Sequence, residues 1–384
     1  MPRSLNSGLY VHIPFCASIC NYCNFTRSLF DPDLKRRYVD ALVAEIREAP
    51  VRWPAFLERP EPDTLYFGGG TPSLLEPEEI ARLIEAGRTS LGLRGESEVT
   101  LEANPETISV GRLRRFRGAG VNRLSFGVQS FRNQELGRLG RLHDAERARE
   151  VVGWAREAGF DNVSLDLMMW LPQQSVSQWL ESVDELIALH PDHASLYLLE
   201  VYPNAPLRDD MARAGWSQAP DEDAAAMYEE AMTRTEVAGL EQYEISNVAR
   251  PGKRARHNMK YWRDGDWLAF GCGAHSTLDE ARWKNVTSTL DYLARVEAGD
   301  SVIAERRTLR PHDRLGEALF MGLRLTDGVD LRALGERYAV DVWAAYGPRL
   351  EPHLEAGLAR KTGECLRLTR RGRLLANEVM AVFV

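Results

Sequence analysis

Three of the five cysteines in this 384-residue chain, Cys16, Cys20 and Cys23, stand in a C-x-x-x-C-x-x-C spacing. The β-rich stretch Tyr10–Ile13 precedes them and Pro14 ends it, so we expect the thiols on a loop at the carboxyl end of a strand. Zinc sites prefer paired C-x-x-C knuckles with four protein ligands, and a redox dithiol needs only two cysteines. An iron–sulfur cluster fits better, although a closed cubane takes four thiolates and three would leave one iron open. The alternative is a group of buried structural cysteines.

The loop resembles that of the radical S-adenosyl-L-methionine (SAM) superfamily. The resemblance implies a [4Fe–4S] cluster on Cys16, Cys20 and Cys23. It also implies that the open iron takes the amino and carboxylate groups of SAM, and that an electron from the cluster cleaves SAM to a 5′-deoxyadenosyl radical.

Composition narrows the class of protein. A chain with 44% hydrophobic and 27% charged residues reads as a globular protein, long enough for an α/β barrel with an appendage. The formal charge of −8 gives no electrostatic reason to expect nucleic acid as a partner. No signal-peptide pattern and no run of membrane-span length is present, and the unpaired cysteine pattern suits the reducing cytoplasm.

Strand-like and helix-like segments alternate through the first half of the chain, which favours βαβ units and a parallel sheet. Strands are expected to begin near Gly8, Asp63, Glu98, Val121, Asn162 and His193, with helices such as Asp33–Ala49, Pro77–Leu91, Asp144–Ala158 and Val176–Leu189 between them. Six units match the partial (β/α)6 barrel that the radical SAM resemblance implies. In such sheets the active site collects at the carboxyl ends of the strands.

Residues with distinctive chemistry do follow the expected strands. The glycine-rich turn Gly68–Thr71 follows the second strand, and glycines let backbone N–H groups approach a ligand closely. Asp166 lies inside the apolar fifth strand, where an unpaired carboxylate would be costly, so a partner or ligand is expected. Glu102 and Gln129 end the third and fourth strands, and Arg141 follows twelve residues after Gln129. Each residue alone is more often structural than functional.

Together, the order and spacing of these residues resemble the branch that holds oxygen-independent coproporphyrinogen III oxidase and its haem-chaperone relative, from about Leu9 to Phe383. Two departures from the family pattern concern the substrate end of the site. Trp170 and Gln173 replace two glycines, which could narrow the cavity mouth or stiffen a loop, and Cys272 replaces a proline. The resemblance implies SAM contacts at Tyr10, Gly69, Gly70, Thr71, Glu102, Gln129, Arg141 and Asp166.

A second constellation, His257-Asn258-Met259-Lys260-Tyr261-Trp262, could give a haem an axial imidazole and flat apolar faces. The haem-chaperone relative carries the same H-N-x-x-Y-W pattern, which implies haem contacts at His257, Tyr261 and Trp262. A packed histidine–aromatic corner is the alternative, and the direct iron ligand stays open. His275 is a weaker candidate.

From about Arg310 the pattern changes to helices at Leu315–Leu323 and Leu331–Tyr338 and a short strand at Leu366–Thr369, as in a winged helix. Twelve Lys/Arg against ten Asp/Glu in residues 310–384 make no basic footprint for DNA. The expected division is a radical SAM partial barrel over residues 1–240, a haem-side connecting region over 241–305, and a C-terminal winged-helix-like domain over 306–384.

Two functions compete, and they leave open whether the chain is an enzyme. The first is a haem chaperone that passes haem to an acceptor protein, with an electron donor and a transient membrane association among its partners. The second is the oxidase, which decarboxylates coproporphyrinogen III to protoporphyrinogen IX. In the oxidase family a fourth cysteine follows the loop at the position of Phe25, and an N-terminal extension precedes the loop. Phe25 and the intact His257–Trp262 motif favour the chaperone, and an unrelated radical SAM transferase is a third hypothesis.

Overall fold

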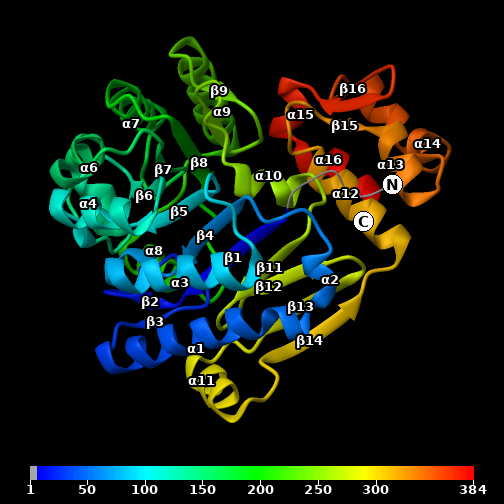
Figure 1. Cartoon of the computed structure of the whole chain (residues 1–384). Helices are drawn as coiled ribbons and strands as arrows, with labels where there is room; N and C mark the ends of the chain where they lie inside the picture. The colour runs from blue at the N-terminus through cyan, green and yellow to red at the C-terminus, as the bar shows by residue number, and fades with distance from the viewer. Residues whose placement is uncertain (1–6) are drawn as a thin grey trace.

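Seven parallel strands form the centre of the molecule, in the order β11-β1-β4-β5-β6-β7-β8 (Figure 1). The computed structural model describes residues 7–384. Antiparallel strands extend the sheet at both edges to twelve strands. The central strands are β1 (Gly8–Ile13), β4 (Thr64–Gly69), β5 (Glu98–Ala103), β6 (Arg123–Gln129), β7 (Val163–Met169), β8 (His193–Leu198) and β11 (Trp267–Phe270). The flanking strands are β9 (Glu241–Gln242), β10 (Asn247–Ala249), β12 (His275–Leu278), β13 (Ala281–Asn285) and β14 (Ile303–Thr308).

Helices connect the parallel strands and bury their apolar faces on the outside of the sheet (Figure 1). Local signals set their ends: a capping box between Glu76 and Glu79 begins α3, and Gly92 ends it with φ of 70°. These helices are α1 (Pro32–Arg52), α3 (Pro77–Leu91), α4 (Val110–Ala119), α6 (Ala145–Glu157), α7 (Val176–Ala188) and α9 (Asp221–Val237). Shorter elements are α2 (Pro54–Leu57), η1 (Pro72–Leu74), η2 (Pro105–Thr107), α5 (Asn133–Arg138), α8 (Pro206–Ala214) and α11 (Thr289–Ala298).

The predicted α/β class with six β/α units is confirmed, and all six predicted strand starts lie within two residues of the observed ones. The structure adds β11 as a seventh parallel strand beside β1 and the antiparallel strands β12–β14 after it. Residues 241–305 thus contribute strands to the main sheet. The division of the chain at residues 240 and 305 stays a prediction.

The C-terminal part has its own hydrophobic core and a three-stranded sheet in the order β15-β17-β16 (Figure 1). It consists of α12 (Pro311–Gly322), β15 (Val329–Asp330), α13 (Leu331–Tyr338), α14 (Val342–Glu355), β16 (Ala359–Thr362), β17 (Cys365–Leu368), α15 (Arg370–Leu374), α16 (Ala376–Met380) and η3 (Ala381–Phe383). Helices followed by a small sheet agree with the predicted winged-helix-like appendage. Within residues 7–384, no helix combines the length and apolarity needed to cross a membrane.

Parallel strands give the barrel two different ends. We call the end where β1 and β4–β8 finish the mouth, and the end where they begin the floor. The short helix α10 (Arg256–Trp262) covers the floor, because Glu98 at the start of β5 accepts hydrogen bonds from the backbone N–H groups of Arg256 and His257, each at 3.1 Å. Helix α10 also packs against α12, so the C-terminal part lies beyond the floor (Figure 1).

Candidate cluster and cofactor site

The cysteine loop lies at the mouth, as its position after β1 predicts. Strand β2 (Phe15–Cys16) pairs with β3 (Ser28–Leu29), and this pairing folds residues 16–28 into a closed lobe. Burial raises the pKa of the Cys16 thiol to about 11, so an electrophilic metal is needed to hold it as thiolate. In the described chain no three His, Cys, Asp or Glu side chains converge on one metal ion. Three cysteines on one loop are the ligand type that iron–sulfur clusters use, with each thiolate on a separate iron.

A single cavity of about 450 Å³ opens beside this loop. This volume is in the range of small-molecule and cofactor sites. The predicted residues that line it are Cys16, Cys20, Cys23, Gly69, Gly70, Thr71, Glu102, Gln129, Arg141 and Asp166. The structure thus brings together ten of the predicted positions from six different segments of the chain.

The glycine turn is required by the close approach of the cysteine loop. A Cβ atom on Gly70 would lie 2.8 Å from the Cys16 sulfur and 2.7 Å from the Phe15 carbonyl oxygen. Gly69 has φ of 120°, a backbone conformation that L side chains rarely adopt, and its N–H donates to Glu102 Oε2 at 3.1 Å. Glycine at these positions therefore lets the turn pack against His12 and the cysteine loop, where a side chain would clash.

Two half-buried carboxylates, Glu102 and Asp166, line the inner part of the cavity. Glu102 accepts from the Tyr66 hydroxyl at 2.7 Å, and Asp166 accepts from the Ser125 hydroxyl at 3.3 Å. Burial raises the pKa of Glu102 to about 7 and the pKa of Asp166 to about 6. The hydrogen bond from Ser125 gives Asp166 a partner, as expected for a carboxylate within an apolar strand. Both groups keep further acceptor capacity for a ligand hydroxyl or ammonium.

Other polar groups at the mouth lack protein partners. Gln129 ends β6 with φ of 70°, and its Oε1 atom is buried without a hydrogen bond in the described chain. Arg141 donates from Nη2 to Asn104 Oδ1 at 2.8 Å and to the Gly127 carbonyl at 2.7 Å, while its buried Nε has no partner. Its Nη1 lies 3.5 Å from the Cys20 sulfur. Unsatisfied buried polar atoms of this kind are what a bound polar ligand would complete.

Four predicted residues lie away from this cavity, toward the floor. Tyr10 does not line the cavity: its hydroxyl meets His12 Nδ1 at 3.2 Å, and its ring stacks on Tyr66 at 6.1 Å between centroids. Trp262 turns to the C-terminal side and lines a separate pocket of about 330 Å³ with Leu325 and Val329. His257 and Tyr261 lie in the interior beneath Tyr66.

The His257 ring is fully engaged in this structure. Its Nδ1 pairs with the Thr64 hydroxyl at 2.9 Å and its Nε2 with the Tyr261 hydroxyl at 2.7 Å. Burial, followed by the nearby charge of Lys260, lowers the pKa of His257 to about 3, so the ring is neutral at any working pH. Its side chain is within the closed floor, with a residue exposure of 1%. The floor thus resembles the packed histidine–aromatic corner.

The end of β8 and the loop after it supply cavity residues that the sequence did not predict. Tyr197, Leu198 and Tyr202 line the cavity, as do Phe25 and Arg27 from the cysteine lobe. Part of this could have been predicted, because the loop after the sixth parallel strand must lie at the same end of the sheet as the other site loops.

The two departures from the family pattern have local explanations. Trp170 and Gln173 have φ of 63° and 60°, and neither lines the cavity. Trp170 Nε1 donates to the Ala219 carbonyl at 2.7 Å, and the Gln173 backbone N–H donates to the Ser217 carbonyl at 2.9 Å. These contacts support a stiffened loop and give no narrowing of the mouth. The backbone N–H of Cys272 donates to the Tyr38 hydroxyl at 2.9 Å, a bond that proline cannot make.

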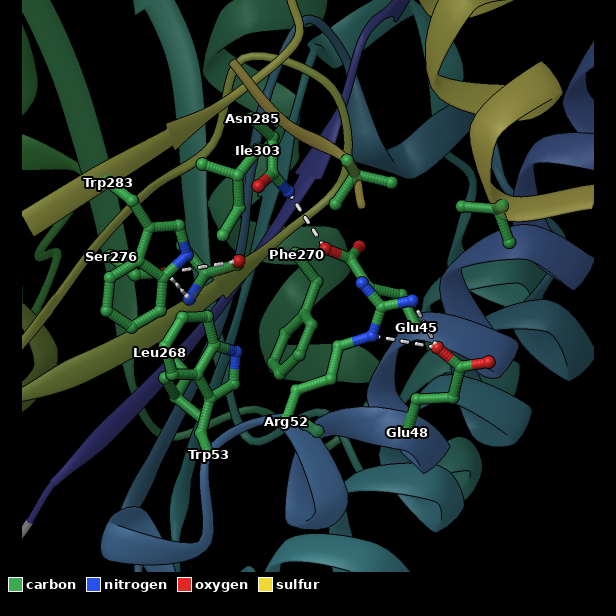
Figure 2. A pocket seen from close by; sticks show the side chains of 14 residues that line it. Glu45, Glu48, Arg52, Trp53, Leu268, Phe270, Ser276, Trp283, Asn285 and Ile303 are labelled. Atoms are coloured by element: carbon green, nitrogen blue, oxygen red, sulfur yellow. Dashed lines mark hydrogen bonds and ion pairs between the residues drawn. The ribbon is translucent and has the colours of Figure 1, made fainter. Parts of the chain in front are cut away.

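A second, much smaller pocket lies behind the sheet and carries no predicted residue (Figure 2). Its volume is about 30 Å³, enough for water only. Glu45 there accepts from Asn285 Nδ2 at 2.8 Å, and Arg52 pairs with Glu48 at 2.7 Å (Figure 2). Trp53 stacks on Trp283 at 4.0 Å between centroids. This pocket joins α1 to β11–β14 and is part of the packing.

Comparisons with known proteins agree with this geometry. The Radical SAM superfamily profile matches residues 10–186, and the HemN C-terminal domain profile matches residues 309–375. The chain is 34% identical over 376 residues to the heme chaperone HemW of Bacillus subtilis, covering 98% of both chains. It is 37% identical to HemW of Mycobacterium tuberculosis, covering 97% of this chain and 93% of the relative.

Among solved structures, coproporphyrinogen III oxidase (HemN) from Escherichia coli, described as a radical SAM enzyme, superposes with a TM-score of 0.86 at 25% identity. The superposition covers 98% of this chain and 90% of the oxidase. The oxidase therefore shares the whole architecture, while the HemW relatives are more similar in sequence. The chain belongs to the radical SAM superfamily and, within it, to the family of the heme chaperone HemW.

Proposed function

We propose that this protein is a haem chaperone that binds a [4Fe–4S] cluster and SAM at the mouth and passes haem to an acceptor protein. The observation that carries the proposal is its similarity to HemW over 98% of both chains. Phe25, at the position where the oxidase family has a fourth cysteine, supports it. The acceptor and an electron donor are further proteins, and cysteines kept as free thiols suit a reducing compartment such as the cytoplasm.

The three thiolates of Cys16, Cys20 and Cys23 would hold the cluster, which supplies a reducing electron when bound. Their donor chemistry fits, because thiolates are the ordinary ligands of iron–sulfur clusters. Arg141 Nη1, 3.5 Å from the Cys20 sulfur, would donate to the thiolate and offset part of the negative charge.

SAM would occupy the remainder of the cavity. Gly69, Gly70 and Thr71, which line the cavity, would present backbone groups to its amino acid part. Glu102 and Asp166 would accept from its ammonium and ribose hydroxyl groups, and the free Gln129 Oε1 and Arg141 Nε would complete the polar contacts. Tyr10 would support this site from below, through His12 and Tyr66.

The haem role of His257, Tyr261 and Trp262 stays a proposal that carries a structural cost. An iron atom on His257 would have to displace the Thr64 or the Tyr261 hydroxyl, and α10 would have to leave the floor. At the nitrogen that bound iron, a coordinate bond would replace the hydrogen bond.

The oxidase is the second candidate, because its fold covers 98% of this chain. One anaerobic preparation separates the two functions. The reconstituted protein should retain haem, give a Soret band and transfer it to an apo-haem protein. The same sample, with SAM, reductant and coproporphyrinogen III, should form no protoporphyrinogen above background. Sustained protoporphyrinogen formation without haem retention would assign the oxidase activity instead.

A further inference from the structure

We propose that haem binds at the outer rim of the cluster cavity, with its ring against Phe25 and a propionate on Arg27. This inference rests on the proposed function, since it names where the carried haem would lie. The ligand class is an anionic, planar tetrapyrrole. The site is built by the cysteine lobe on one side and by the end of β8 with the loop after it on the other.

The rim carries a concentration of exposed apolar rings and side chains. Phe25 is 65% exposed, Leu198 45%, Tyr197 41% and Tyr202 36%. All four line the same cavity as the cysteines. Large exposed rings around one opening are costly in water unless a ligand or partner covers them. Aromatic and aliphatic side chains of this kind can pack against the flat face of a macrocycle.

Arg27 gives the rim a matching charge. Its Nη1 donates to the Phe25 carbonyl oxygen at 2.8 Å, so the guanidinium lies beside the Phe25 backbone. Its buried Nε has no hydrogen-bond partner, and no ion pair to Arg27 exists among residues 7–384 that the structure describes. A propionate is the planar anion that a guanidinium binds best. Glu200 also lines this cavity and accepts from the Tyr202 hydroxyl at 2.9 Å.

The depth of the cavity leaves this rim for a third component. The cysteines, the glycine turn and the two carboxylates form its inner wall, where the cluster and SAM would bind. The exposed rings lie outside that wall. A haem at the rim would thus stand over the cluster site, while a haem on His257 would lie at the opposite end of the barrel.

Phe25 is then a specificity-determining residue, because it places an apolar ring where the oxidase family has a thiol. A ring adds contact area for the haem face, whereas a fourth thiol would not. The floor offers less: His257 lines neither the mouth cavity nor the pocket beside Trp262.

The test uses the full chain with its cluster loaded anaerobically, titrated with haem and with iron-free protoporphyrin IX. Phe25→Ala should weaken both ligands roughly tenfold, because ring contact is lost whether or not iron is present. Arg27→Gln should weaken protoporphyrin IX but leave the affinity of its dimethyl ester unchanged. Leu290→Ala in α11 is the matched control, since Leu290 is also 65% exposed and lies away from the cavity. Cluster absorbance should be unchanged in Phe25→Ala and Leu290→Ala.

Three results are decisive. Tenfold weaker porphyrin binding in Phe25→Ala, with Tyr261→Phe unchanged, supports the rim. Wild-type binding of both porphyrins by Phe25→Ala and Arg27→Gln, with a Soret band shifted or lost in Tyr261→Phe, overturns it in favour of the floor. Tyr261→Phe removes one hydroxyl and keeps the ring, so the protein should remain folded, and a thermal melt checks this. If wild-type protein retains no haem at all, the proposed function fails rather than the placement.

Discussion

The mouth and the floor of the barrel contain the same kinds of residue but differ in whether their polar atoms are satisfied. At the floor, both ring nitrogens of His257 have partners, and Glu98 accepts two backbone N–H groups of α10. At the mouth, buried atoms of Gln129, Arg141 and Arg27 have none in the described chain. Unpaired buried atoms also occur near the floor, at Arg123 Nε where β6 begins and at Asn162 Oδ1 just before β7, so the comparison holds for the cavity lining and the surroundings of His257. The unpaired atoms of the cavity lining suit a ligand, whereas the paired atoms around His257 suit a structural role.

Strand β5 makes the comparison within six residues. Glu98 and Glu102 are both carboxylates that point into the barrel, one at each end of the strand. Glu98 fixes a helix, whereas Glu102 is shared between the Tyr66 hydroxyl and the glycine turn. The two glutamates therefore differ in role because their hydrogen-bond partners differ, although the residue type is the same. The predictions below test this difference, beginning with the largest expected effect.

Replacing any one of Cys16, Cys20 and Cys23 by Ser should abolish the cluster, because a serine oxygen is a poor substitute for thiolate at iron. Iron and sulfide should fall from about four of each per chain to near zero. The fold should survive, since the loop is at the mouth. Cys272→Ser and Cys365→Ser are the controls and should keep the brown absorbance. Stoichiometric zinc without sulfide in the wild type would contradict the cluster assignment.

His257→Ala should have the opposite outcome, with a damaged fold and an intact cluster. It deletes a buried ring and leaves the hydroxyls of Thr64 and Tyr261 unpaired, so we expect the unfolding free energy to fall by roughly 3 kcal/mol. Chemical denaturation measures this value. Tyr261→Phe, which removes one of the two bonds, should cost only about 1 kcal/mol. A His257→Ala variant as stable as the wild type would show that the floor is not a structural corner.

The mouth was predictable from sequence for a physical reason, and the floor was not. Parallel strands end at one edge, so polar residues after each strand, from Cys16 to Asp166, had to converge whatever the details of packing. The partner of His257 is Thr64, almost two hundred residues earlier, and no periodic pattern encodes that contact. The strand β11 was missed for the same reason, since only pairing with β1 distinguishes it from a loop. Phe25 was noticed as a departure, but its exposure could come only from the structure.

Glu102→Gln should alter the pH dependence of stability at the mouth. Burial raises the folded-state pKa of Glu102 to about 7, above its usual value in an unfolded chain. The native state therefore binds more protons than the unfolded state between about pH 4 and pH 7, and the unfolding free energy falls as pH rises through that window. The loss should be roughly 1–3 kcal/mol in the wild type without ligands.

The glutamine variant should flatten most of this slope, since its side chain does not titrate. Asp166→Asn, whose parent carboxyl has a pKa raised to about 6, should flatten a smaller and more acidic part of it. Denaturation series at pH 4.5, 6 and 7.5 measure both effects. A slope of equal size in Glu102→Gln and wild type would mean that folding does not raise the pKa of Glu102.

The smallest effect concerns the loop in which Trp170 and Gln173 replace the family glycines. Both have left-handed φ values near 60°, a conformation that costs an L residue about 1–2 kcal/mol. Gln173→Gly should relieve this cost and stabilise the protein by a few tenths to about 1 kcal/mol, because the side chain is exposed and the backbone bond to Ser217 is kept. Trp170→Gly relieves the same strain but loses the indole bond to Ala219, worth about 1 kcal/mol, so its net change should be near zero.

Hydrogen exchange then distinguishes backbone strain at Trp170 from the hydrogen bond by which its indole holds residues 217–219. In Trp170→Gly, amides around residues 217–219 should exchange faster although global stability is unchanged, since the indole no longer holds that segment to the end of β7. In Gln173→Gly they should exchange as in the wild type. If Trp170→Gly instead stabilised the protein more than Gln173→Gly and left this segment protected, the indole would hold nothing. Trp170 would then strain the backbone at this position, and no hydrogen bond would offset the strain.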